Sequence, residues 1–376
     1  MAVLHRLPRL LLLLVSVIFL VLGLLAGLMR LGWQWTSVTP VLSVSHGELM
    51  ICGFLGTLIS LERAVALGRW LGYAAPVTTA LGTLGLITGA PMGPAILLVV
   101  LGSLVLVSIL IVVLFKQFAL HNVAISLGAG AWLVGNALWL LGAVLPHIVQ
   151  WWIGFLVLTI AGERLELNRL LAPSRYARSA FGFGLALFLF GMAFVSGVPR
   201  HGHQTLGIGI LTLALWLARF DVARFTVRRQ GLPRFVALCL FAGYAWLGVG
   251  GLIWMFAVPV DATGSLSFFP YDAALHTVFL GFVFSMIFAH APIVFPAVTG
   301  RAQPFRHVFY AHVLLLNLSL IARISADLAG SLPGLHWSSL GNAAALVLFL
   351  ANNAYGMITG HHAAKGSQIE VASPFC

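Results

Sequence analysis

The chain has 376 residues, of which 61% are hydrophobic and only 8% are charged, and its formal net charge at pH 7 is +11. A soluble domain has about 25% charged residues, so this composition excludes a soluble protein and indicates one that crosses a membrane many times. The positive charge needs no nucleic-acid partner, because basic loops beside an anionic leaflet are its ordinary cause in a membrane protein.

Runs of about 20 apolar residues predict membrane-spanning helices, because a helix rises about 1.5 Å per residue across a core about 30 Å thick. We expect the first run to be an uncleaved helix, since it is too long for a signal peptide and has no clear cleavage site. The loops are short, so residues 1–376 form a single transmembrane domain. The twelve predicted spans are roughly 10–31, 41–61, 73–91, 95–115, 122–143, 150–170, 179–197, 204–220, 234–257, 273–296, 308–328 and 337–358.

The basic residues indicate how the spans are oriented. With a cytoplasmic N-terminus, most loop arginines, such as Arg63 and Arg229, fall on the inner side, and only Arg30, Arg200 and Arg323 fall at the outer side. Basic loops are typical of the cytoplasmic face. We therefore expect a multi-pass protein of the bacterial cytoplasmic (inner) membrane, in contact with lipid, with both termini in the cytoplasm.

One polar pattern occurs three times on the apolar background: a histidine, then a Gly-Phe pair, then a Glu or His nine residues after that glycine. The three segments fall on predicted spans two, six and ten, which run in the same direction. This predicts three parallel four-helix pseudo-repeats, about 1–116, 117–230 and 231–376. The histidines are His46, His147 and His276, and the later polar residues are Glu62, Glu163 and His290.

Histidines gather at the predicted outer ends of the spans. His46, His147 and His276 begin their helices there, and His201 and His203 lie in the outer loop between spans seven and eight. Neutral imidazole is a common ligand of haem iron and copper. Polar groups inside a bilayer are costly unless they are partnered or functional, so this layer favours a metal or haem site. No C-x-x-C-H motif is present, which excludes covalent c-type haem attachment.

Spans two and ten carry residues in the pattern of a known family, and on these motifs the chain resembles the NnrS family of haem- and copper-containing membrane proteins. It departs from that pattern at Glu48, where the family usually has a second histidine. It departs again at His290, since the family's arginine and histidine in that half of span ten are absent. The matching residues are His46, Met50 and Gly53-Phe54 in span two, and Leu275-His276, Gly281, Met286 and Thr299-Gly300-Arg301 in span ten.

The layout is also similar to the catalytic subunit of haem-copper oxidases and nitric oxide reductases, which hold a low-spin haem between histidines of helices two and ten. This resemblance implies one haem b between His46 and His276. It also implies a second metal, copper or another, at His147, His201 and His203, which match less well. For those three, the alternative is a solvated loop or a rim around the haem propionates.

Several other polar residues are candidates for supporting roles. Glu48 follows His46, and we expect it to face nearly the same side and to fix the imidazole or act as a catalytic proton donor. Asp272, one turn before His276, has the same roles open to it, or is a helix N-terminal acid favoured by the helix dipole.

The predicted inner layer contains a second group of polar residues. Glu62-Arg63 and Glu163-Arg164 are most simply interhelical ion pairs, and a proton entrance is the alternative. His290 and His312 are candidates for the same proton path or for a second pair of ligands. His276 and His290 are about 21 Å apart along a helix and cannot share one metal ion.

These features favour a haem-dependent membrane redox protein connected with nitric oxide binding, reduction or stress protection, which receives electrons from an unidentified donor. The resemblance leaves open whether the protein turns over nitric oxide, like a nitric oxide reductase, or only binds this gas or a similar one. The alternative is a transporter or channel for a small solute, a metal or haem.

Overall fold

The computed structural model describes residues 6–34, 40–258, 267–299 and 304–370. Every regular element in these ranges is a helix. In chain order, these are α1 Arg6–Arg30, α2 Pro40–Val44, α3 His46–Glu48, η1 Leu49–Gly56, α4 Thr57–Leu67, η2 Trp70–Tyr73, α5 Ala74–Thr88, α6 Met92–Lys116, α7 Leu120–Leu140, α8 Leu145–Leu167, η3 Asn168–Leu171, α9 Arg175–Phe194, α10 Pro199–Phe220, α11 Ala223–Thr226, α12 Leu232–Phe256, α13 Phe268–His276, η4 Thr277–Val283, α14 Phe284–Thr299, α15 Phe309–Leu328 and α16 Leu332–Glu370.

Within the described ranges, eleven helical spans are long and apolar enough to cross a membrane. The 25 residues of α6, for example, exceed the length that a core about 30 Å thick requires. The predicted all-α membrane-embedded class is therefore supported. Long apolar helices bury backbone polar groups within themselves, which is what a bilayer demands.

The remaining predicted span, 204–220, corresponds to α10. This helix has 22 residues and packs between α9 and α12. It is not among the eleven described helices that are long and apolar enough to cross a membrane. Its first turns hold Arg200, His201 and His203, which make its starting end polar. The twelve-span layout thus stays a prediction at this helix.

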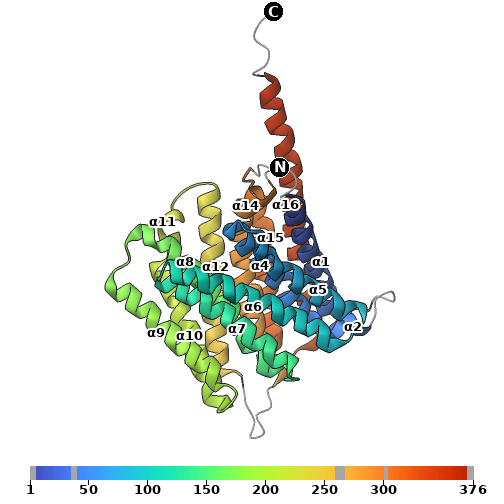
Figure 1. Cartoon of the computed structure of the whole chain (residues 1–376), viewed down its shortest axis with the longest axis vertical. Helices are drawn as coiled ribbons and strands as arrows, with labels where there is room; N and C mark the ends of the chain where they lie inside the picture. The colour runs from blue at the N-terminus through green and yellow to red at the C-terminus, as the bar shows by residue number, and fades with distance from the viewer. Residues whose placement is uncertain (1–5, 35–39, 259–266, 300–303, 371–376) are drawn as a thin grey trace, which may run out of the picture.

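The spans that carry the repeated polar pattern lie at the centre of the bundle. In an apolar 18-residue stretch of each span, 61% of the residues are buried in His46–Leu67, 72% in Leu145–Leu167 and 67% in Phe268–Pro296, against at most 50% in the other candidate spans. Peripheral helices pack around them in sequential pairs, such as α5 with α6 and α9 with α10 (Figure 1). The polar pattern therefore occupies the interior and not the outer surface.

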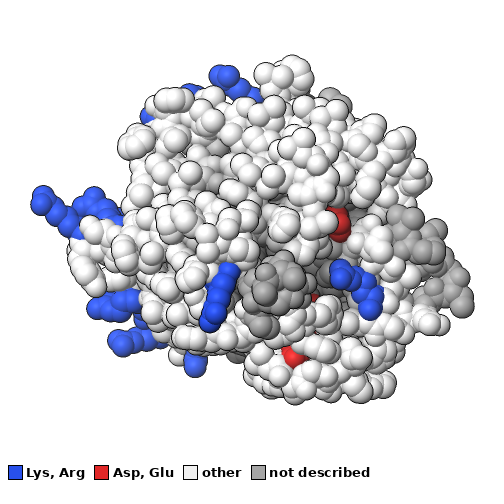
Figure 2. Space-filling view, turned by 90° about the horizontal axis from the view of Figure 1, so that it is seen from below, with Lys and Arg blue, Asp and Glu red and all other residues white. Residues whose placement is uncertain are grey.

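The bundle has two ends of different character. We call the end where α3, α8 and α13 begin the histidine end, and the opposite end, where α4 and α8 finish, the arginine end. Figure 1 shows the start of α1 and the C-terminal half of α16 at the same upper end, the arginine end. Seen from below, the histidine end is mostly uncharged, with scattered basic side chains and small acidic areas (Figure 2).

Two of the three central spans change from α-helix to π-helix after a histidine. The π-helix η1 begins three residues after His46, and η4 begins directly after His276. The third central span, α8, is α-helical throughout. π-Helical segments are rare and are frequent at functional sites. Spans two and ten therefore share a π-helical segment after their histidine, and span six has no such segment.

Candidate functional site

A cavity of about 280 Å³ opens at the histidine end between α1, α8, α15, α16 and the two spans that carry π-helices. His46 and His276 both line it. The structure thus brings together the two histidines that the sequence placed on spans two and ten.

The His46 imidazole is held against α1. Its Nδ1 lies 2.7 Å from the carbonyl oxygen of Gly23 and must donate the hydrogen bond, because a carbonyl only accepts. Gly27 makes room for the ring, since a Cβ at this position would lie 2.8 Å from both Nδ1 and Cε1 of His46. The second ring nitrogen, Nε2, is left for a ligand in the cavity.

The His276 imidazole is held in the same manner by its own helix. Its Nδ1 lies 2.9 Å from the Asp272 carbonyl oxygen and 3.2 Å from the Asp272 carboxylate. Arg323 of α15 donates to the same carboxylate oxygen at 2.8 Å. Metal-bound histidines usually donate their other ring N–H to a carbonyl or carboxylate, which fixes the ring and its tautomer. Asp272 therefore has the contact that a supporting role requires, and that role stays a prediction.

The two imidazoles are nearly parallel. Their ring centres are 6.4 Å apart and their planes differ by 16°. A metal–imidazole bond is about 2.0–2.1 Å long and a ring nitrogen lies roughly 1.15 Å from its ring centre, so two imidazoles on opposite sides of one metal ion have centres about 6.3–6.5 Å apart. The spacing fits one metal ion between the rings.

The rest of the lining fits a flat apolar group that carries a few polar substituents. Arg30 and Arg323 bring positive charge to the cavity. Three buried polar atoms that line it have no hydrogen-bond partner among the described residues: Oη of Tyr271, Oδ1 of Asn342 and Nε of Arg323. Buried polar groups are normally hydrogen-bonded, so these atoms point to a ligand with polar groups. The apolar lining includes Met50, Ile51, Trp152, Phe279, Phe284 and Leu346.

The residues predicted to hold a second metal do not form a cluster. His147 is exposed in the first turn of α8. His203 is buried and stacks on Trp254 with ring centres 5.0 Å apart, whereas His201 is exposed. Within the described part of the chain, no three His, Cys, Asp or Glu residues are grouped as metal ligands. A second metal site at these histidines therefore stays a prediction.

The placement of the His-x-His motif in a loop was wrong. His201 and His203 lie in the first turns of α10, which begins at Pro199. Proline is favoured at the first turn of a helix because its missing N–H has no intrahelical partner there. The predicted span began too late because the polar residues masked the helix start.

Glu48 was expected to face the same side as His46, and this was wrong. Residues two apart on an α-helix point about 200° apart, so Glu48 faces away from the His46 side. It is absent from the cavity lining, and its Oε2 is buried without a partner among the described residues. A role as proton donor in the cavity is therefore not supported by its position.

The acidic and basic residues of the arginine end form ion pairs, but not all in the expected combination. Arg63 of α4 pairs with Glu163 of α8. Arg164 pairs instead with Asp221, which the sequence did not single out, through two hydrogen bonds of 2.7 and 2.8 Å. Glu62 is exposed on α4. The interhelical pairing across the central spans is thus confirmed for Arg63 and Glu163.

His290 and His312, the two histidines predicted for the inner layer, lie in different surroundings. The Nδ1 of His290 donates to the carbonyl of Met286 at 2.8 Å. His312 is buried against Phe288, with ring centres 4.7 Å apart, and its Nδ1 lies 3.1 Å from the Asn352 amide nitrogen. Their roles as a ligand pair or in a proton path stay predictions.

Sequence reasoning missed several residues of the cavity, above all Arg323, Tyr271 and Asn342. Arg323 carried a usable signal, because an arginine within a membrane span is costly and marks a site or a partner. Tyr271 and Asn342 carried none, since single polar residues of this kind are frequent in helices. The Gly300 and Arg301 part of the family motif lies outside the described residues.

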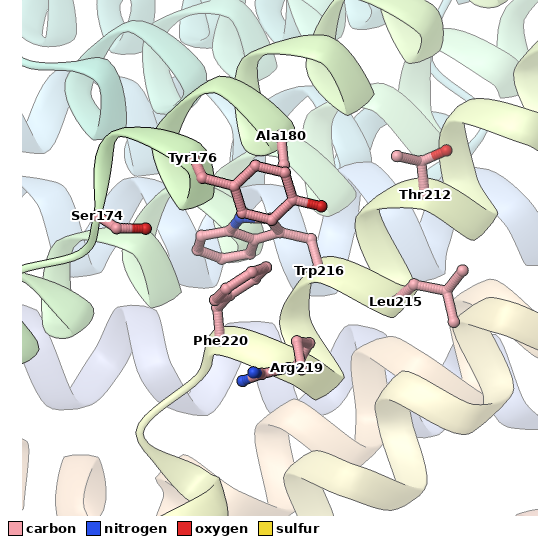
Figure 3. Close-up of a pocket in the computed structure, with 8 residues that line it drawn as sticks. All are labelled: Ser174, Tyr176, Ala180, Thr212, Leu215, Trp216, Arg219 and Phe220. Atoms are coloured by element: carbon pink, nitrogen blue, oxygen red, sulfur yellow. The ribbon is translucent and has the colours of Figure 1, made fainter.

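A larger surface groove of about 510 Å³ lies elsewhere, between α9 and α10 (Figure 3). The aromatic rings of Tyr176, Trp216 and Phe220 cluster there beside Arg219. Aromatic and basic side chains are typical of the membrane–water interface. The groove contains no histidine, so the cavity at the histidine end is the better candidate site.

The helices and the cavity define the chain as an all-α protein suited to a membrane, with a cavity at one end of the bundle. The model of a protein family described as a domain of unknown function (DUF8744) matches residues 9–357. Because the match covers most of the chain, the protein belongs to this family. A comparison with curated proteins finds no match.

Proposed function

We propose that this protein is a haem-dependent membrane redox protein that holds one haem b between His46 and His276. The observation that carries the proposal is the 6.4 Å separation of two nearly parallel imidazoles across a cavity. Both rings use Nδ1 to bind a carbonyl of the chain, which leaves both Nε2 atoms as ligands. The apolar lining and the two arginines suit a macrocycle that carries carboxylates.

Each group of the chain has a defined task in this proposal. His46 and His276 would hold the haem, which would supply one-electron transfer. Asp272 and Arg323 orient His276 through the contacts described above. Arg30 and Arg323 neutralise the propionates, while the apolar walls exclude water. The haem would also supply the chemistry that binds a small gas.

The connection with nitric oxide, as binding, reduction or protection against its stress, rests on the resemblance to the NnrS family. The same resemblance supports a bacterial cytoplasmic membrane and a layout of twelve helices in three groups of four. The proposal includes no second metal, because the other histidines are dispersed.

The haem ligands are tested by substituting each histidine in the purified protein. We expect the wild type to contain b-type haem, and His46→Ala or His276→Ala to lose it or to change from low spin to high spin. The measurement is the pyridine haemochrome assay with metal analysis. His147→Ala serves as the control, because this residue is exposed and lies outside the cavity.

An unaltered haem spectrum in both substituted proteins would refute the ligand assignment. A colourless wild type without metal would instead support the rival proposal, a transporter or channel for a small solute, a metal or haem.

A further inference from the structure

The surface groove between α9 and α10 lies at the arginine end of the bundle, because α9 follows α8, which finishes there (Figure 3). Helix α9 begins at Arg175 and α10 ends at Phe220, so the groove takes residues from the first turns of one helix and the last turns of the other. The groove is open to the surroundings, since Tyr176 is 74% and Leu215 is 62% exposed. In a bilayer, the end of two adjacent spans is where lipid headgroups meet the acyl chains.

The groove has an aromatic wall that is held in place. Trp216 is 3% exposed, and its indole donates to the Ala177 carbonyl at 2.7 Å, which fixes the ring. Phe220 lies beside Trp216 with ring centres 5.7 Å apart, and Tyr176 meets Phe220 edge-on at 6.2 Å. Ala180, which also lines the groove, is small and leaves the space open. Tyrosine and tryptophan are enriched at the headgroup level of membranes, so this wall suits the membrane–water interface.

The groove carries positive charge without a matching acid. Arg219 lines it beside the aromatic wall, and Arg175 and Arg178 are exposed in the first turn of α9. None of these three arginines forms an ion pair with another residue that the structure describes. The nearest acids along the chain, Glu166 and Asp221, already pair with other arginines. The complementary ligand is therefore an anion.

Both helices continue the groove as exposed apolar stripes along the membrane span. On α9, Ala180 is followed at helical spacing by Phe183 and Phe190, which are 63% and 52% exposed. On α10, Ile208 lies two turns before Leu215 on the same face and is 40% exposed. Residues spaced by three, four or seven positions share one face of a helix. Such stripes fit acyl chains, which a free phosphate or another small anion lacks.

We propose that the groove between α9 and α10 binds one anionic phospholipid. The headgroup phosphate lies at Arg219, in the positive field of Arg175 and Arg178, and the acyl chains follow the apolar stripes. Charge-assisted hydrogen bonds from arginine to phosphate are strong and frequently bidentate. The combined charge of three arginines favours a headgroup of net negative charge over a zwitterionic one. This site involves no haem, so it is independent of the proposed function.

Native mass spectrometry of the purified full-length protein, stripped of lipid in detergent, tests the proposal. Phosphatidylglycerol is the anionic probe, phosphatidylcholine with the same acyl chains is the zwitterionic one, and we expect the wild type to prefer the former. We expect Arg219→Gln to weaken phosphatidylglycerol binding about fivefold, the ratio that corresponds to about 1 kcal/mol for one arginine near an anionic lipid. Arg69→Gln is the matched control, because Arg69 is also exposed at the arginine end, beside the 80% exposed Trp70, but outside the groove.

A second pair of substitutions tests the groove and leaves the charge unaltered. Ala180→Phe fills the space beside the aromatic wall, whereas Ala66→Phe adds the same ring at an exposed position of α4. We expect only Ala180→Phe to weaken phosphatidylglycerol binding. Equal binding of the two lipids by the wild type, or equal effects of the groove and control substitutions, would overturn the proposal. Displacement of phosphatidylglycerol by an equal concentration of inorganic phosphate would also overturn it, because phosphate alone would then be the ligand.

Discussion

The His46 imidazole has room beside α1 because residue 27 is a glycine. A Cβ at this position would come within 2.8 Å of two ring atoms, which is closer than real Cβ contacts. We predict that Gly27→Ala displaces the ring, so that the proposed haem becomes partly high spin or its content falls. Absorption spectroscopy of the purified variant measures both effects.

Gly130→Ala is the matched control for this substitution. It also adds a methyl group to a membrane helix, but nothing lies within 4 Å of the added Cβ. We expect the control to keep the wild-type spectrum. A Gly27→Ala protein with an unchanged spectrum would argue against the position assigned to His46.

At the residue scale, the sequence pattern singled out the two histidines, because His46 lies seven residues and His276 five residues before a Gly-Phe pair in a central span. It did not predict Arg323 or Asn342, since these come from helices without any repeated pattern and converge only in three dimensions. Glu48 was misplaced because closeness in sequence was taken for closeness in space, although two residues along a helix reach the opposite side.

At the scale of the elements, a buried ion pair fastens α8 to the turn after α10. The side chains of Arg164 and Asp221 are 4% and 0% exposed, and Asp221 also accepts from the Ala223 N–H at 2.7 Å. Removing one partner leaves a buried charge uncompensated, which typically costs about 3–5 kcal/mol. We predict that Asp221→Asn lowers the thermal unfolding temperature clearly, as measured by differential scanning fluorimetry in detergent.

Glu166→Gln provides the comparison. Glu166 pairs with Arg169 on the surface, with side chains 40% and 50% exposed, and exposed pairs contribute only about 0–1 kcal/mol. We expect almost no change in the unfolding temperature. Equal small effects of the two substitutions would contradict a stabilising role for the buried pair.

The positions of the helices were predicted more completely than the hydrogen-bonding pattern within them. Apolar runs locate the helices, because length and hydropathy are visible in the sequence. The π-helices η1 and η4 were not predicted, since a change from i→i+4 to i→i+5 bonding leaves the apolar composition unaltered. The partner of Arg164 was missed because the acid that it meets lies 57 residues further along the chain.

For the whole molecule, the proposed orientation places the histidine end outside the cytoplasm. The native cysteines Cys52 and Cys239 are buried, so single introduced cysteines can report accessibility once Cys376 is replaced. We predict that His201→Cys reacts with a membrane-impermeant maleimide in intact cells. Arg229→Cys is expected to react only after the membrane is opened, because basic loops stay in the cytoplasm.

The reverse labelling pattern would invert the proposed topology. Labelling of both positions in intact cells would contradict an arrangement with the two loops on opposite sides. The fold class was predicted from the composition of the chain. One described long helix, α10, is less apolar than the eleven candidate spans, because its first turns are polar.

The most direct test of the account is the electron paramagnetic resonance spectrum of the oxidised wild-type protein. Two imidazoles on one iron make the haem low spin, and planes only 16° apart predict a rhombic signal, whereas perpendicular planes would give a highly anisotropic one. The account predicts the rhombic low-spin signal. A five-coordinate high-spin signal, or no haem signal at all, would contradict a haem held between His46 and His276.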